Sequence, residues 1–339
     1  MNARVPALLM LSATSLAWTW DAALAPSGSS LTWDMCQGEF TASEETEIEL
    51  AANSWDAGSG EVMRGAIWNF SRGSDDVSCA PDNNDNEVYS RSRQWFTSRG
   101  WPSSTLALCS RTGNDIDISF VQDVTWSTAV PSGTSNTSIG QTALHEFGHA
   151  LGFNHENTVV ATMNASYPFG GDISAHKYRP HENDYAGLVA NRPGASTGTN
   201  LLLGRFLFAG TSAQELWDQK VFADWTVCDG VVSSPNGPDE IYAIIEGTSS
   251  QSPLIEWWLS EDTDCDAGTR YDVGSRTPTI SSGTPYLVHP NPYDFTGVPT
   301  GHYYLCAEID PNGLIAETPP SDSDNNLVSE VEVTVQGCP

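Results

Sequence analysis

The stretch HEFGHALGFNH, residues 145–155, supplies three imidazoles and a carboxylate within one short piece of backbone. On a helix, His145 and His149 lie one above the other on the same face. Two neutral imidazoles on one face can bind a zinc ion, and Glu146 then sits where it can polarise a water molecule at the metal. We therefore predict a helix over 141–151 that carries a zinc site.

A third ligand comes from the residues that end this helix. Gly152 closes the apolar-periodic run, and glycine can take a positive φ angle that stops a helix and turns the chain. The turn can bring His155 to the metal from outside the helix. Three histidines leave one of four zinc positions open, which is typical of a catalytic site. The alternative is a buried helix whose histidines make ordinary hydrogen bonds; the added glycine and third histidine count against it.

The full pattern His-Glu-x-x-His-x-x-Gly-x-x-His resembles the metzincin metallopeptidases at every fixed position. That family places a methionine-containing turn beneath the metal, and Met163 follows the third histidine at a suitable distance. The resemblance to matrixin-type metzincins is strongest over residues 115–188. It implies an α+β metzincin catalytic domain, made of a twisted mixed sheet and the zinc-binding helix, over residues 26–192.

Local patterns predict the other elements of this domain. A helix is expected over 42–57, where Thr41 and Glu44 form a plausible capping box. Apolar or alternating segments predict strands, and the resemblance implies a closing helix. The strands are expected at 31–33, 62–70, 86–89, 104–108 and 115–120, and the closing helix at 181–188.

Two positions depart from the matrixin pattern, and one departs from the astacin pattern. Glu156, directly after the third histidine, is more typical of astacins than of matrixins, which usually have serine there. The tyrosine that astacins place two residues after the methionine is absent, because Ala165 stands there and Tyr167 follows two residues later. Matrixins carry Asp-Asp in the closing helix, where this chain has Asn183 first. The subfamily therefore stays open, with matrixin-like preferred.

The beginning of the chain and its charge indicate export. A positively charged start, an apolar run from Val5 to Trp18 and the small residues 22–25 predict a signal peptide over 1–25. The chain has 14 Lys and Arg against 43 Asp and Glu, a net charge of -29, which repels nucleic acid and anionic membranes. No later stretch is long enough to span a bilayer. We expect a secreted, extracellular monomer.

Seven cysteines fit an oxidising compartment. We expect a disulfide between Cys79 and Cys109, with Cys36 left over, and two bridges of undetermined connectivity among the last four cysteines. A Cys36 thiolate on the metal would hold the enzyme inactive, but this cysteine lacks the Pro-Arg-Cys-x-x-Pro-Asp setting of the matrixin cysteine switch. Finding Cys36 in a disulfide would exclude that role.

An oxygen-rich loop precedes the middle strands. Residues 82–87 read DNNDNE, a set of side chains that can hold a calcium ion. The alternative is a solvated turn, which is the commoner meaning of such a cluster. Both interpretations stay open from the sequence.

A second domain follows a linker. Residues 193–200 are rich in Gly, Ser and Thr, as linkers are, and residues 201–339 alternate short apolar segments with turn clusters. This pattern predicts an all-β sandwich. Segments near Trp257 and Tyr303 and the ending 308–326 resemble the CARDB type of bacterial immunoglobulin-like module. Strands are expected at 240–245, 254–259, 303–307 and 328–335.

These observations predict a secreted zinc-dependent endopeptidase that acts on proteins or peptides. In the chemistry that the motif implies, His145, His149 and His155 hold Zn²⁺, and Glu146 is the general base. Met163 supports the ligands from below. The alternative is a secreted binding or adhesion protein that uses the β-sandwich, with the zinc fold as a scaffold; retention of Glu146 argues against it, because a structural metal site needs no base.

Overall fold

The computed structural model describes residues 28–56, 68–81, 83–112, 115–128, 137–155, 162–163, 165, 180, 184, 187–188, 191, 199–208, 225–232, 238–246, 249–262, 265, 268–282, 286–290, 292–317 and 326–337. The expected signal peptide and most of the expected linker lie outside these residues. So do Asp82, Glu156, Tyr167 and Asn183.

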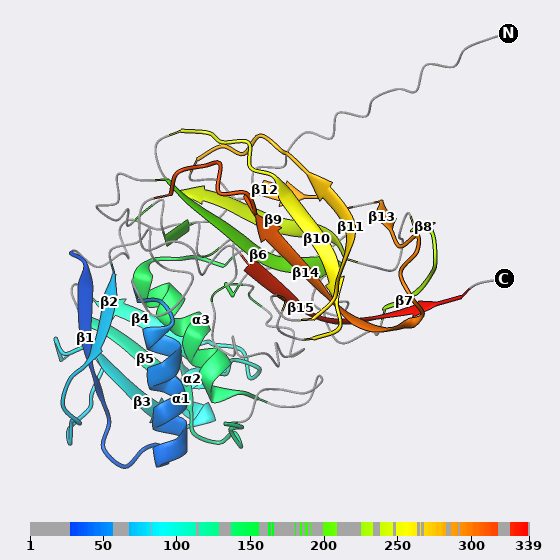
Figure 1. Cartoon of the computed structure of the whole chain (residues 1–339). Coiled ribbons are helices and arrows are strands. Elements are labelled where there is room, and N and C mark those ends of the chain that lie inside the picture. Colours follow the sequence, from blue (N-terminus) through cyan, green and yellow to red (C-terminus); the bar gives the residue numbers. More distant parts are fainter. Residues whose placement is uncertain are drawn as a thin grey trace, which may run out of the picture.

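Among the described residues, the N-terminal part contains one five-stranded mixed sheet and the three numbered helices (Figure 1), besides a few helical residues near position 188. The strands are β1 (Ser30–Met35), β2 (Asn69–Arg72), β3 (Glu87–Arg91), β4 (Ala107–Thr112) and β5 (Asp115–Val121). The helices are α1 (Ala42–Asn53), α2 (Arg93–Ser98) and α3 (Ile139–Leu151). The strand order is β2-β1-β3-β5-β4, and only β4 runs antiparallel to its neighbour. This order places β4 at one edge of the sheet, where no described strand pairs with its outer side.

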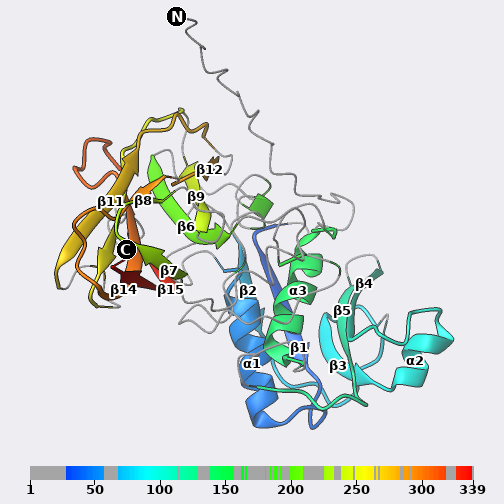
Figure 2. The same cartoon turned by 90° about the vertical axis from the view of Figure 1, so that its right-hand side faces the viewer.

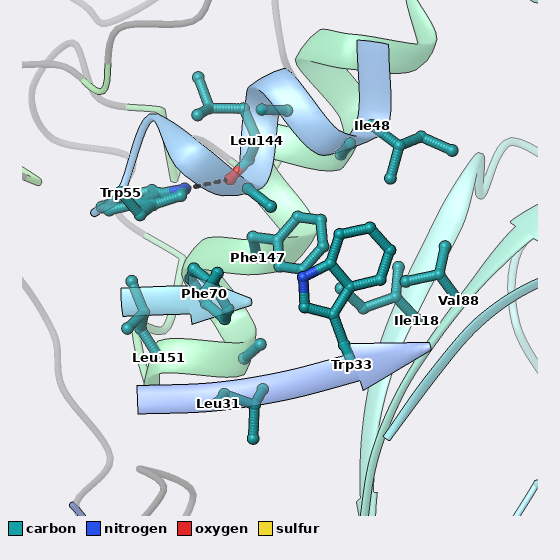
Figure 3. Packing of buried hydrophobic residues seen from close by; sticks show 14 of the residues in the cluster. Leu31, Trp33, Ile48, Trp55, Phe70, Val88, Ile118, Leu144, Phe147 and Leu151 are labelled. Carbon is teal, nitrogen blue, oxygen red and sulfur yellow. Dashed lines mark hydrogen bonds between the residues drawn. The ribbon is translucent and has the colours of Figure 1, made fainter. Parts of the chain in front are cut away.

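One hydrophobic core joins the sheet to α1 and α3, which lie side by side (Figure 2). Figure 3 shows Trp33 of β1 against Phe147 of α3, with ring centroids 5.3 Å apart, and Phe70 of β2 beside the same phenylalanine at 4.9 Å. All three rings are buried. Burying a large aromatic side chain stabilises a fold by about 2 to 3 kcal/mol. This packing fixes α3 against the sheet.

Helix α1 begins as expected and ends earlier than expected. The Thr41 hydroxyl accepts the N–H of Glu44, whose carboxylate accepts the N–H of Thr41, so the capping box is confirmed. The predicted end at residue 57 is wrong, because the helix stops at Asn53. The buried Trp55 instead turns inward and donates its indole N–H to the carbonyl of Leu144 at 2.9 Å (Figure 3).

Other elements of this part also differ from the expected ones. The strand expected at 104–108 starts later, at Ala107, because the N–H of Thr105 bonds to the carbonyl of Pro102 in a turn. The short helix α2 was not expected; Ser92 caps it by accepting the N–H of Trp95. The strand expected at 62–70 is described only from residue 68, and β2 begins at Asn69.

The predicted disulfide between Cys79 and Cys109 is wrong. Cys36 bonds to Cys79, and Cys109 is free. Cys36 directly follows β1, and the loop after the parallel strand β2 returns beside it, where Asp76 donates to the carbonyl of Met35. Cys109 lies on β4, at the opposite edge of the sheet. A disulfide at Cys36 excludes the switch role for this cysteine.

The oxygen-rich loop is held by its own polar groups where it is described. Asn83 donates its side-chain N–H to Glu87 at 3.0 Å, and the Asp85 N–H bonds to the Asn83 side chain at 2.9 Å. The cluster of Asp76, Cys79 and Glu87 also brings ligand atoms within 4.8 Å of one another, but the Cys79 sulfur is in a disulfide. The described part of the loop therefore gives no support for calcium.

The C-terminal part is all-β. Its strands are β6 (Asn200–Phe208), β7 (Trp225–Cys228), β8 (Val231–Val232), β9 (Pro238–Glu246), β10 (Ile255–Ser260), β11 (Arg270–Arg276), β12 (Tyr286–Val288), β13 (Tyr293–Asp294), β14 (Gly301–Ile309) and β15 (Asn326–Gln336). They form sheets of order β11-β10-β14-β15-β7, β12-β9-β6 and β13-β8. The four strands expected here lie at β9, β10, β14 and β15.

Side chains from the two larger sheets share a second, separate hydrophobic core, which includes Leu203 of β6, Ile241 of β9 and Trp257 of β10. Cys265 and Cys306 form a disulfide, and Cys228 is also disulfide-bonded. In both views these strands are grouped apart from the N-terminal sheet (Figures 1 and 2). No helix among the described residues is long and apolar enough to cross a membrane.

Candidate metal centre

Helix α3 carries the two motif histidines and the glutamate. Ser138 caps its start by accepting the N–H of Gln141 at 3.3 Å. Leu144, Phe147 and Leu151 recur at helical spacing and are buried in the core. The opposite side of the helix therefore presents His145 and His149 to the cavity described below.

The turn at the end of α3 delivers the third histidine. Gly152 has φ 105° and ψ 8°, the left-handed conformation expected of it. The N–H of Phe153 bonds to the carbonyl of Gly148 at 3.1 Å, which closes the helix end. The chain then reverses, and His155 faces the two helix histidines.

The three imidazoles converge through their Nε2 atoms. The Nε2 of His155 lies 3.3 Å from that of His145 and 3.2 Å from that of His149. Ligand nitrogens at about 2.0 to 2.1 Å from a tetrahedral zinc ion are about 3.3 Å apart. The observed separations are therefore compatible with three ligands of one metal ion.

Hydrogen bonds on the far side of two rings set their tautomers. The Nδ1 of His145 lies 2.7 Å from the carbonyl oxygen of Thr162, and the Nδ1 of His149 lies 2.7 Å from that of Phe153. A carbonyl only accepts, so each Nδ1 must carry the proton and each Nε2 presents a lone pair. The lone pairs of these two rings and the Nε2 of His155 are close together, an arrangement that fits the binding of a metal ion.

The electrostatic environment keeps these rings neutral. Burial lowers the pKa of His145 well below 6.5, with a further contribution from His149. Burial lowers the pKa of His149 to about 4, and burial also lowers the pKa of His155. Neutral imidazole is the form that binds metal, so the site needs no loss of protons at pH 7.

Glu146 is 6% exposed and faces the edge strand β4. Its Oε2 accepts the N–H of Cys109 at 2.7 Å. Burial raises the pKa of Glu146 to about 8, and the Cys109 N–H opposes that rise. Burial, together with the Glu146 charge, raises the pKa of the free Cys109 thiol well above 9. A carboxylate held by one backbone N–H keeps its other oxygen for a proton transfer.

Met163 lies beneath the zinc helix. It is 1% exposed, and its sulfur packs against Gly148 so closely that a Cβ at this glycine would overlap it and would come within 3.0 Å of Trp55. The backbone N–H groups of Thr162 and Met163 bond to the buried carboxylate of Asp184, at 2.5 and 3.4 Å. The turn that contains Met163 is thus clamped from both sides.

A cavity of about 710 Å³ lies over the histidines and Glu146. One wall is the edge strand β4 from residue 107 to residue 111, and the chain before it adds Trp101 and Pro102. A cavity of this size accommodates a short peptide segment. The unpaired edge of β4 borders it along its length.

The structure brings all of the predicted site residues together: His145, Glu146, His149, His155 and, beneath them, Met163. Sequence reasoning missed the groups that orient them, namely the carbonyls of Thr162 and Phe153, the N–H of Cys109 and the carboxylate of Asp184. Backbone groups carry no side-chain signal, so only Asp184 could have been found from the sequence, through the acidic residue in the expected closing helix. Residues 184, 187, 188 and 191 of that segment are helical.

Among solved structures, this chain is similar to a CARDB domain from Pyrococcus furiosus that was determined in complex with di-metal ions, at 12% identity and a TM-score of 0.27 over 42% of this chain and 97% of that one. A domain of a putative cell surface protein from Methanosarcina acetivorans is 18% identical, with a TM-score of 0.21 over 32% and 94%. TM-scores below 0.5 do not establish a common arrangement. No curated protein matches the chain significantly.

The family model of the matrixin peptidases matches residues 94–190, a segment that contains β4, β5, α3, the three histidines and Met163. The model covers less than half of the chain and includes the whole metal centre described above. The resemblance drawn from the sequence motif is therefore confirmed: residues 94–190 are similar to the matrixin peptidases.

Proposed function

We propose that this protein is a secreted, zinc-dependent endopeptidase that hydrolyses peptide bonds of proteins. The observation that carries the proposal is the convergence of three neutral imidazole Nε2 atoms beside the buried Glu146, in a cavity bordered by a free strand edge. The matrixin match supports a metallopeptidase in general terms. Zinc as the metal, and Glu146 as the base, are the finer parts of the proposal.

His145, His149 and His155 would hold the zinc ion, and three protein ligands leave a position open for reactants. When bound, zinc would supply Lewis acidity for the attack of water on a carbonyl carbon. Glu146 would accept the proton of the attacking water and deliver it to the nitrogen of the leaving amine. The Cys109 N–H would hold Glu146 in place through both proton transfers.

An extended peptide is the substrate shape that this cavity favours. β4 is an edge strand, and none of the strands that the structure describes pairs with it on the cavity side, where the Cys109 N–H bonds to Glu146. A peptide laid beside β4 would pair with its other backbone groups on this side and bring one of its carbonyls toward Glu146 and the histidines. Recognition through backbone groups fits an enzyme that cleaves within a chain.

Export and the division into domains also belong to this proposal. The disulfides Cys36–Cys79 and Cys265–Cys306 are compatible with an extracellular protein. The two hydrophobic cores are consistent with a peptidase domain over 26–192 and a β-sandwich domain over 201–339, joined by a linker at 193–200. The accessory domain would be immunoglobulin-like and of the CARDB type.

Hydrolysis of unfolded casein by the secreted, processed chain tests the proposal. We expect cleavage that a chelator abolishes and that added Zn²⁺ restores, whereas added Ca²⁺ alone does not restore it. New N-termini within the casein chain would identify an endopeptidase. A zinc-loaded protein that cleaves neither casein nor peptide libraries would contradict the proposal and favour a binding protein with a zinc scaffold.

A further inference from the structure

One buried carboxylate outside the metal motif is bonded to the turn that supports the zinc ligands. Asp184 is 1% exposed, and it lies in a helical segment well separated in the sequence from α3. It accepts the N–H of Thr162 at 2.5 Å through Oδ2 and the N–H of Met163 at 3.4 Å through Oδ1. A buried charge is expensive unless it is well hydrogen-bonded, so its retention calls for an explanation.

The same peptide unit connects Asp184 to a metal ligand. The carbonyl of Thr162 and the N–H of Met163 belong to one peptide group. That carbonyl accepts the Nδ1 proton of His145 at 2.7 Å, while the N–H on the other side bonds to Asp184. Hydrogen bonds in series polarise one another, and a carboxylate on the N–H makes the carbonyl a stronger acceptor. A stronger acceptor at Nδ1 fixes the tautomer and makes Nε2 a better donor to a metal.

Packing fixes the position of the peptide group that joins Asp184 to His145. The sulfur of Met163 presses against Gly148, within α3, and Trp55, just after the end of α1, borders the same contact. If Thr162 and Met163 shifted, the carbonyl that orients His145 would shift with them. The Asp184 bonds therefore set the position of this turn relative to α3.

We propose that Asp184 is a positioning residue for the metal: through the peptide unit between Thr162 and Met163 it holds His145 in its Nδ1-protonated tautomer, with Nε2 toward the zinc ion. This inference rests on the proposed zinc site and deepens it. The two bonds described for Asp184 reach the backbone N–H groups of Thr162 and Met163, one peptide group away from the ligand His145. Removal of Asp184 therefore acts on metal affinity and site geometry before it acts on chemistry.

The test compares Asp184→Asn with Leu188→Ala in the full-length secreted protein. Asparagine keeps the shape of Asp184, but it removes the charge and places a donor against backbone donors. Leu188 is fully buried in the same helical segment and in the core, so its truncation controls for general loss of packing. Zinc Kd is measured by competition with a chromophoric chelator, and the visible spectrum of the Co²⁺-loaded protein reports ligand geometry.

We expect Asp184→Asn to raise the zinc Kd about 10-fold or more, since residues that hold metal ligands in place contribute about 10- to 100-fold. Its Co²⁺ spectrum should change. Leu188→Ala should lower the Tm and leave both the Kd and the spectrum unchanged. A folded Asp184→Asn protein with the wild-type Kd and spectrum would overturn the inference, as would an equal rise in Kd for both variants.

A second variant covers the case in which Asp184→Asn does not fold. Asp184→Glu retains the charge with a longer side chain, and a severalfold rise in zinc Kd supports the inference, whereas an unchanged Kd overturns it. Peptide hydrolysis measured in parallel separates a failure of the proposed peptidase activity from a failure of the proposed role of Asp184. A wild-type chain that binds zinc tightly and cleaves nothing contradicts the proposed peptidase, and the comparison of zinc Kd between the variants still decides the role of Asp184.

Discussion

The two hydrophobic cores differ in what they bury beside apolar side chains. Among the described residues, the buried polar side chains of the C-terminal part are Ser260 and Asp310, and Asp310 holds a turn by accepting two backbone N–H groups. The N-terminal part buries many more: Asp56, Glu87, Ser90, Asp115, Asp117, Ser119, Ser138, Gln141, Glu146, Thr162 and Asp184.

This difference indicates that the N-terminal part carries the candidate site. Polar groups cost free energy to bury, so they persist where a site or its supports need them. The C-terminal part, in contrast, is stabilised by apolar packing and by a disulfide, and its described residues gather no comparable site. Changes to the N-terminal core should therefore alter activity, and changes to the C-terminal core should alter stability alone.

The largest effect is expected at Glu146. Glu146→Gln keeps the size of the side chain and removes the carboxylate that accepts a proton, so peptide turnover should fall by about 10³- to 10⁴-fold, the upper end for loss of a general base. Zinc content, measured by elemental analysis, should stay at the wild-type level. A zinc-loaded variant that turns over peptide at the wild-type rate would show that another residue supplies the base.

His149→Ala and Glu256→Gln are the controls for that variant. Deleting one of three ligands weakens the metal itself, so His149→Ala should lose zinc and activity together. Glu256 pairs with Arg270 on the surface of the C-terminal part, and its substitution should leave turnover unchanged. Equal zinc retention by both site variants would contradict the assignment of His149 as a ligand.

A matched pair of glycines tests the comparison directly. A Cβ at Gly148 would overlap Met163, and a Cβ at Gly274 would overlap the indole of Trp257 in the other core. Overpacking of this kind destabilises a protein by about 1 to 3 kcal/mol. Gly148→Ala should lower the Tm and also raise the zinc Kd, because it displaces the turn beneath the ligands.

Gly274→Ala should lower stability by a similar amount and leave zinc binding and peptide turnover as they are. The measurements are thermal unfolding, chelator competition and peptide hydrolysis on both variants. If Gly274→Ala weakens zinc binding as much as Gly148→Ala does, the two cores are coupled and the contrast drawn above is lost.

A smaller effect concerns pH. Asp56 accepts the N–H of Phe70 at 2.5 Å, and burial raises its pKa to about 6. Because this folded-state pKa exceeds the unfolded one, the folded chain binds the proton more tightly. Asp56 therefore adds stability as pH falls through 6 toward 4, and that stability is lost as pH rises from about 4 through 6.

Asp56→Asn keeps the acceptor and removes this titration. The difference in stability between wild type and variant should change by about 1 kcal/mol from pH 4.5 to pH 7.5, below the full value of the shift because Asp56 borders solvent. Thermal unfolding with a chelator present removes any contribution from zinc loss. Parallel pH profiles for the two proteins would show that Asp56 is not protonated in the folded chain.

The smallest effect is expected from removing the C-terminal part. A chain of residues 26–193 should cleave a small peptide at close to the full-length rate, because no described C-terminal residue reaches the metal centre and the two cores are separate. Kinetics on a short fluorogenic peptide check this. An inactive or unfolded product would mean that the domain boundary is misplaced or that the two parts share a core.

The sequence by itself determined the metal centre, because its ligands are local. The helix period places His145 and His149 on one face, and the left-handed Gly152 returns the chain so that His155 completes the set. These relations depend on backbone geometry over residues 145–155 alone. The capping box at Thr41 was predictable for the same reason.

Only the tertiary structure decided which distant groups meet. The Cys36–Cys79 disulfide follows from the parallel pairing of β1 with β2, and the bond from Cys109 to Glu146 follows from β4 lying at the sheet edge beside α3. The bonds from Asp184 to the Met163 turn likewise join separate segments. Such contacts depend on strand order and on backbone N–H and C=O groups, which almost every residue type carries. No local sequence pattern therefore predicts them.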